Sequence, residues 1–331
     1  MPPRHVYAVQ ESLQRRRPVP VRRSLWSWVR VLGGVGILAF LVWRLGTGAF
    51  LDGLRLIDGW ALGAALGIGA LTTWCCAWRW SLVAGGLGIR LPVWTAVVHC
   101  YRSVFLNATL PGGVLGDVHR AVRHGRDVGD VGRGIRAVVW ERSAGQVVQA
   151  AIALVVLSVF PSPVRAYLPV AAGLVLLGGL AAVLLARVLP NGGASRWARA
   201  LRTARSDIRE GLLGRRNWLG IVVASAVVVL GHLATFLVAA HTAGATAPLS
   251  RLAPLTLLAL LAMGLPANIG GFGPREGVAA WAFGAAGLTA AQGVSTAVVY
   301  GALVLVSSLP GAAVPLIRRI SAPAAAPEPA A

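Results

Sequence analysis

The sequence predicts an all-α polytopic membrane protein with about six full spans and two re-entrant or broken-helix hairpins. Hydrophobic residues make up 56% of the 331-residue chain, charged residues only 13%, and the mean hydropathy is +0.70. Uncharged apolar runs such as residues 60–78 and 218–240 are long enough to cross a bilayer, which takes roughly 20 residues. Two polar, glycine-rich breaks, residues 107–117 and 266–276, interrupt this apolar sequence. Such segments survive at membrane depth only when they are buried in protein or line a cavity, so we expect the function there.

All 31 basic residues are arginine, and the net charge is +20. In a soluble chain this charge would suggest nucleic acid, but in a membrane protein it marks cytosolic loops that face anionic lipid, so no nucleic-acid partner is expected. The arginines concentrate in residues 118–136 and 190–217, whereas residues 161–165 and 241–251 hold one each. This distribution predicts a multi-pass plasma-membrane protein with both termini in the cytosol.

The predicted spans divide the chain into one membrane domain and two tails. Residues 1–24 form a basic tail that we expect to be disordered in the cytosol, and residues 320–331 form an Ala/Pro-rich tail. Residues 25–319 form a single transmembrane domain. Its full spans are predicted at residues 25–43, 60–78, 143–160, 166–186, 218–240 and 290–317.

Two segments of this domain must begin and end on the same side of the membrane. Residues 91–136 start and finish in the cytosol, and residues 252–287 start and finish outside. Each segment is therefore predicted to be a hairpin that turns at one of the two polar breaks. The return limb of the first hairpin is rich in arginine, so we expect it to run along the cytosolic interface.

The hairpins belong to two half-repeats of nearly equal length, residues 60–160 and 218–317. In each half a span precedes a break at a similar distance, and the two halves enter the membrane from opposite sides. This arrangement predicts an inverted-topology repeat, and many transporters bind their substrate between such halves. Coincidental spacing is the alternative, because residue identity between the halves is slight.

The two breaks carry residues suited to a phosphate group. Pro111 and Pro266 end one helix, and the glycines allow another to begin, which leaves free N–H groups that attract anions. Arg275 would lie beside the second helix start and Arg120 beside the first. The asparagines are expected to cap freed backbone groups or to bind a head group, and the carboxylates to neutralise arginines. The predicted substrate-binding residues are Asn107, Gly112, Gly113, Asp117, Arg120, Glu141, Arg142, Asn268, Gly270, Gly271, Arg275 and Glu276.

Glu141 and Arg142 open the third clear span and cannot face each other on a helix. We expect Glu141 to pair with an arginine of the first break and Arg142 to face lipid phosphate, although an interfacial pair without substrate contact is the alternative. Gln146 and Gln149 would extend this polar stripe. For His232, in the middle of a span, the alternatives are a proton relay and a hydrogen bond between helices.

At these residues the chain resembles the transmembrane region of lysylphosphatidylglycerol synthases, also called the flippase-like domain family. The resemblance covers about residues 25–317. The matching motifs are Phe105-Leu-Asn107, Leu110-Pro111-Gly112-Gly113, Gly116-Asp117-x-x-Arg120, Glu141-Arg142, Leu265-Pro266 and Ile269-Gly270-Gly271-Phe-Gly273-x-Arg275-Glu276. In synthases a cytosolic transfer domain follows this region. Because the present chain ends soon after the last span, the resemblance implies movement of a phospholipid or lipid-linked head group between leaflets, without synthase activity.

We therefore expect a non-enzymatic lipid translocase that uses no cofactor and no metal. One alternative is a membrane-embedded enzyme that acts on lipid-linked phosphate or sugar. It would use a divalent metal bound by Asp117, His119, His124, Asp127 and Asp130. A second is a non-catalytic partner of a glycosyltransferase or synthase. Association of the chain with copies of itself, as a homo-oligomer, is a further alternative.

Overall fold

The computed structural model describes residues 54–110, 113–170, 196–214, 217–264 and 273–313, with a few single positions between 43 and 184. All secondary structure in these ranges is helical, which confirms the all-α class. The first half holds α4 (Gly59–Gly86), α5 (Val93–Thr109), α6 (Leu115–Asp127) and α7 (Val131–Val159). The second half holds α10 (Trp218–Thr242), α11 (Leu249–Ala262), α12 (Pro274–Ala285) and α13 (Ala290–Ser308). Between the halves lie η1 (Arg165–Tyr167), α9 (Arg196–Asp207) and η2 (Ile208–Leu212).

Four of the described helices are long and apolar enough to cross a membrane. They are Gly59–Gly86, Val131–Val159, Trp218–Thr242 and Ala290–Ala313. They correspond to the spans predicted at residues 60–78, 143–160, 218–240 and 290–317. The predicted span at residues 25–43, except for its last residue, and about half of the one at 166–186 lie outside the described residues, as do both tails.

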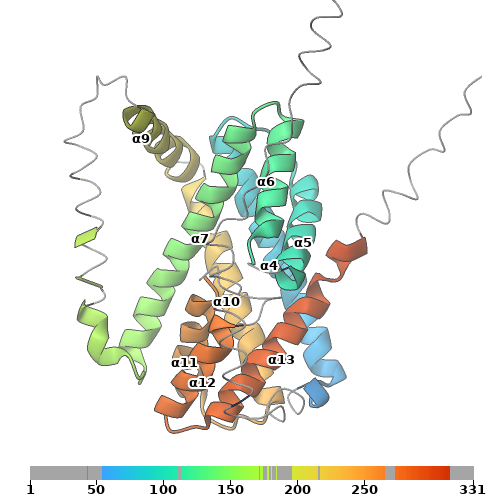
Figure 1. Ribbon diagram of the computed structural model, residues 1–331, viewed down its shortest axis with the longest axis vertical. Coiled ribbons are helices and arrows are strands. Elements are labelled where there is room, and N and C mark those ends of the chain that lie inside the picture. Colours follow the sequence, from blue (N-terminus) through green and yellow to red (C-terminus); the bar gives the residue numbers. More distant parts are fainter. Residues whose placement is uncertain are drawn as a thin grey trace, which may run out of the picture.

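Each predicted hairpin is a pair of short helices joined at a polar break. In Figure 1, α5 and α6 occupy the upper part of the bundle, and α11 and α12 occupy the lower part. Each half has the same order of a long, two short and one long helix, and α4 and α10 run in opposite directions. This is the arrangement expected of an inverted-topology repeat.

The return limb of the first hairpin differs from the expectation. Instead of lying along the interface, α6 packs upright against α5 and α7 (Figure 1). Its Arg120 is only 1% exposed because two carboxylates neutralise it. Arg123 and Arg126 are at least partly accessible, so the helix carries only one buried cation into the bundle.

In each half, a glycine allows the backbones of two neighbouring helices to approach closely. A Cβ on Gly116 would lie 2.1 Å from the backbone oxygen of Ser103, between α6 and α5. In the second half, a Cβ on Gly293 of α13 would lie 2.4 Å from the backbone oxygen of Ala279 in α12. Helices in membranes associate through such small residues, which let their backbones approach. The core of the bundle lies where α10 packs against α4 and α13.

Candidate functional site

Asn107 organises the first break. Its Oδ1 accepts a hydrogen bond from the backbone N–H of Gly116 at 2.8 Å, and its Nδ2 donates to Asp117 Oδ2 at 3.1 Å. The side chain at the end of α5 thus satisfies a free N–H group at the start of α6. Asn107 therefore performs the capping role that was one of its two predicted roles.

Asp117 joins the two hairpin helices to the neighbouring span. Its Oδ1 accepts hydrogen bonds from Ser103 Oγ of α5 at 2.9 Å, Arg120 Nε of α6 at 2.9 Å and Arg142 Nη2 of α7 at 2.7 Å. Burial raises the pKa of this carboxyl, but Arg142 and Arg120 lower it more strongly, so the pKa lies well below its usual range. Asp117 is thus held as a carboxylate on α6, a short helix of the first hairpin.

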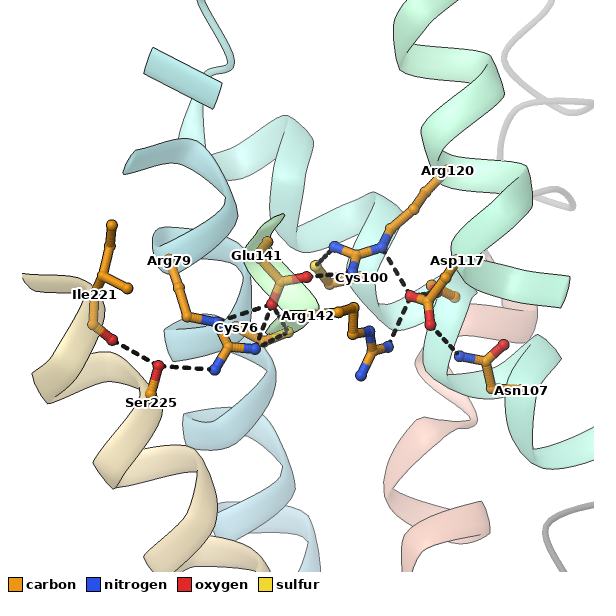
Figure 2. Close-up of polar contacts among 11 residues, drawn as sticks. Cys76, Arg79, Cys100, Asn107, Asp117, Arg120, Glu141, Arg142, Ile221 and Ser225 are labelled. Atoms are coloured by element: carbon orange, nitrogen blue, oxygen red, sulfur yellow. Dashed lines mark hydrogen bonds and ion pairs between the residues drawn. The ribbon is translucent and has the colours of Figure 1, made fainter. Parts of the chain in front are cut away.

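Glu141 is fully buried between two arginines (Figure 2). Its Oε2 accepts a hydrogen bond from Arg120 Nη2 at 2.6 Å, so the predicted pairing with an arginine beside the first break is confirmed. Its Oε1 accepts from Arg79 Nε at 2.8 Å and also pairs with Arg79 Nη2. Arg79 Nη1 donates to Ser225 Oγ of α10 at 3.1 Å, which extends the network into the second half.

Sequence reasoning missed Arg79 because it ended the second span at residue 78. The helix continues to Gly86 and places Arg79 inside the protein, with its side chain 4% exposed. The available signal was a single arginine between Trp78 and Trp80 in an otherwise apolar run. Trp80 supports the same network, because its ring lies 4.7 Å from the guanidinium carbon of Arg120.

The second break has a smaller polar cluster at the start of α12. Gly273 precedes the helix with φ 136°, a backbone conformation that favours glycine. Glu276 Oε2 accepts from the N–H of Gly273 at 2.6 Å, and Glu276 Oε1 accepts from Arg275 Nε at 2.8 Å. The expected neutralisation of Glu276 by arginine is therefore confirmed.

Arg275 also reaches the last span, α13. Its guanidinium carbon lies 5.0 Å from the ring centre of Tyr300. Tyr300 in turn shares a hydrogen bond of 2.9 Å with His232 Nδ1 of α10. His232 thus makes the predicted hydrogen bond between helices. The predicted site residues Gly112, Asn268, Gly270 and Gly271 lie outside the described residues.

A cavity of about 260 Å³ lies between the two breaks. Four of the predicted site residues line it, namely Asn107, Gly113, Arg142 and Arg275. Its other polar lining side chains are Arg79, Gln146, Gln149, His232 and Tyr300. The four remaining described site residues, Asp117, Arg120, Glu141 and Glu276, are not among the lining residues.

Arg142, rather than Arg120, is the arginine near the first break that opens onto the cavity. Its side chain is 43% exposed, compared with 1% for Arg120. Its Nε is buried and has no hydrogen-bond partner among the described residues. It is one of five buried side-chain atoms without such a partner in the described residues, and the exposed part of the Arg142 side chain is what faces the cavity.

The site carries an excess of positive charge. Its four guanidinium groups belong to Arg79, Arg120, Arg142 and Arg275, and its three carboxylates belong to Asp117, Glu141 and Glu276. One positive charge is therefore left without a counter-ion within this set. The arrangement suits an anion that enters the cavity, since a guanidinium binds phosphate oxygens strongly.

The metal-binding alternative finds no support in the part of the chain that the structure describes. No group of three or more His, Cys, Asp or Glu side chains there could hold a metal ion. Asp117, the first member of the predicted cluster, is instead bound to arginines.

Together, fold and site define a polytopic helical membrane protein in which two opposed broken hairpins enclose a cationic cavity. A comparison with protein families agrees: the family model for the lysylphosphatidylglycerol synthase TM region matches residues 27–311. The chain therefore belongs to this family, whose members form a flippase-like group of membrane proteins. No curated protein and no solved structure matches the chain.

Proposed function

We propose that this protein moves a phospholipid, or a related lipid with a phosphate head group, between the leaflets of the plasma membrane. One observation carries the proposal: a single cavity is lined by an arginine from each half, Arg142 of α7 and Arg275 of α12, and the Arg142 side chain is 43% exposed. The head-group phosphate would bind Arg142 from one half of the protein and Arg275 from the other.

The inverted repeat supplies a mechanism for moving the head group. In proteins with such repeats, one half rocks against the other around a fixed site, which opens the site alternately to each side. Here each half contributes one hairpin to the cavity, and the Arg79–Ser225 bond between α4 and α10 is a polar contact across the interface of the halves. The protein would provide only a path, and a gradient or consumption of the lipid would drive net transport. No chemical step, cofactor or nucleic acid takes part.

The proposal is tested with the full chain purified and reconstituted into liposomes that contain phosphatidylglycerol with a fluorescent acyl chain. A membrane-impermeant reductant added outside bleaches only the outer leaflet unless the protein moves the lipid. Wild-type protein is expected to make nearly all of the label accessible. Arg142→Gln and Arg275→Gln should each slow the movement by about tenfold or more, because a hydrogen bond to a charged group contributes about 1.5–3 kcal/mol.

Arg133→Gln is the matched control. Arg133 is 44% exposed, pairs with Asp130 at the start of α7 and does not line the cavity. This variant should move lipid at the wild-type rate. Bleaching by the wild-type protein that is no faster than in protein-free liposomes would disprove the proposal, as would wild-type rates in both cavity variants.

A further inference from the structure

We infer that the cavity selects lipids with one net negative charge, in which the phosphodiester carries an uncharged, hydroxyl-bearing head-group alcohol. This inference rests on the proposed function and names its substrate class. Lipids whose head group carries an ammonium, whether zwitterionic or cationic overall, are disfavoured. Arg142 is the residue that determines this specificity.

Arg142 is the arginine of the site that opens most to the cavity: its side chain is 43% exposed, whereas those of the other three are at most 4% exposed. Arg79 and Arg120 both bond to Glu141, and Arg275 bonds to Glu276. Arg142 shares a single oxygen, Asp117 Oδ1, with Arg120. One phosphodiester, with its single charge, would complete the charge balance and supply acceptors to the open side of the Arg142 guanidinium.

The described part of the lining has no carboxylate that would neutralise an ammonium. All of its charged side chains are arginines, namely Arg79, Arg142 and Arg275. The carboxylates of the site are not among the lining residues: Glu141 and Glu276 have no exposed side-chain surface, and Asp117 is 14% exposed and pairs with Arg120 and Arg142. An ammonium in this cavity would lose its water, find no counter-ion and lie close to like charges, so it would be repelled.

The lining does offer partners for hydroxyl groups. Gln146 and Gln149 both line the cavity, and they lie four and seven residues after Arg142 on α7. At this spacing all three side chains share one face of the helix. Gln146 is displaced from Arg142 by about 6 Å along the helix axis, at a rise of about 1.5 Å per residue. A phosphate at Arg142 would thus place a small polyol next to amides that both donate and accept hydrogen bonds.

The size of the cavity favours a compact head group. Its volume of about 260 Å³ is below the range of about 300–1,000 Å³ typical of pockets for drug-sized ligands. A glycerol-sized alcohol is compatible with this volume, whereas a lipid-linked oligosaccharide would have to leave most of its sugar outside. The phosphate and the first hydroxyl groups are therefore the parts that the protein recognises.

The test compares four lipids with the same fluorescent acyl chain in otherwise identical phosphatidylcholine liposomes. They are phosphatidylglycerol, phosphatidylmethanol, phosphatidylethanolamine and lysylphosphatidylglycerol. The first two carry one negative charge, the third is zwitterionic and the fourth is cationic. Wild-type protein is expected to move phosphatidylglycerol at least about tenfold faster than either ammonium-bearing lipid. Native mass spectrometry of protein incubated with equal amounts of the four lipids should show the same preference in bound lipid.

Three variants at two cavity positions locate the specificity. Arg142→Gln should abolish the preference for anionic lipids, whereas Arg142→Lys, which keeps the charge, should retain it. Gln146→Leu should retain the preference for negative charge and remove the advantage of phosphatidylglycerol over phosphatidylmethanol, which has no hydroxyl group. Arg142→Gln is expected to fold, because Asp117 keeps its bond to Arg120.

The outcomes separate this inference from the proposed function. Equal rates and equal binding for all four lipids would overturn the specificity while lipid movement stands. A preference for anionic lipids that persists in Arg142→Gln would overturn the role of Arg142. Selective binding of phosphatidylglycerol without any lipid movement would overturn the proposed function and leave the specificity intact, and neither movement nor selective binding would overturn both.

Discussion

Replacing Glu141 with glutamine removes the negative charge that the buried Arg79 and Arg120 share. Glu141 has no exposed surface, and the side chains of Arg79 and Arg120 are 4% and 1% exposed. After the change, Arg120 keeps its bond to Asp117, but Arg79 retains no carboxylate and relies on the hydroxyl of Ser225. The variant therefore leaves an uncompensated charge between α4, α7 and α10.

The expected loss of stability follows from this burial. Breaking a buried ion pair by removing one partner costs about 3–5 kcal/mol. At about 2 °C per kcal/mol for a chain of this size, the midpoint of thermal unfolding should fall by roughly 6–10 °C. A second substitution, Arg79→Met, removes the unpaired charge, so the double variant Arg79→Met/Glu141→Gln should be more stable than Glu141→Gln alone.

Thermal unfolding in detergent, followed by intrinsic tryptophan fluorescence, measures these differences. Glu210→Gln is the matched control, because it makes the same chemical change at an exposed residue of η2. It should unfold within about 1 °C of the wild type, since exposed charges contribute little. The reasoning would be refuted if Glu141→Gln unfolded like Glu210→Gln, or if adding Arg79→Met lowered the midpoint further.

Three further predictions follow from the packing and the hydrogen bonds. Gly116→Ala should destabilise the protein by several kcal/mol and slow lipid movement, because the new methyl group would collide with the backbone of Ser103. Gly63→Ala is its control, because a Cβ at Gly63 meets nothing within 4 Å in the described structure. The free energy of unfolding of this variant should equal that of the wild type or exceed it by at most about 1 kcal/mol. A fall in stability at Gly63 to match that at Gly116 would contradict the packing argument. Asn107→Ala removes the cap on Gly116 and should lower the free energy of unfolding, measured by thermal unfolding, by about 1 kcal/mol. An unchanged free energy of unfolding would show that the cap contributes nothing. Tyr300→Phe should cost about 0.5–1.5 kcal/mol through the lost bond to His232, and an unchanged midpoint would argue against that bond.

Much of the architecture can be predicted from the sequence because the bilayer allows few solutions. A spanning segment needs about 20 apolar residues and must satisfy its own backbone, so the described spans coincide with apolar runs. The hairpins follow from the arginine distribution, because each of the two segments must begin and end on the same side of the membrane. The polar breaks then mark where the chain turns, and α11 and α12 lie within residues 249–285, close to the predicted hairpin at residues 252–287.

The assignment of roles within the site is less predictable. Arg120 and Arg142 both lie near the first break, and the sequence alone suggested phosphate contacts for both. The fold buries Arg120 between Asp117 and Glu141 and turns Arg142 towards the cavity. Which side of a helix faces a cavity depends on its packing against other helices, and no local pattern encodes this rotation. Arg79 was missed because the predicted span ended at residue 78, and its partner Glu141 lies 62 residues away on another helix, beyond the reach of a local pattern.

The central claim is that two broken hairpins from opposite sides of the membrane meet around one charged cavity. The most direct test is the labelling of single cysteines with a membrane-impermeant reagent, in a chain whose Cys75, Cys76 and Cys100 are replaced by alanine. Val128→Cys lies exposed beyond the end of α6, and Ala285→Cys lies exposed at the end of α12. We predict that Val128→Cys is labelled only from the cytosolic side and Ala285→Cys only from the opposite side. Labelling of both positions from the same side would contradict the account.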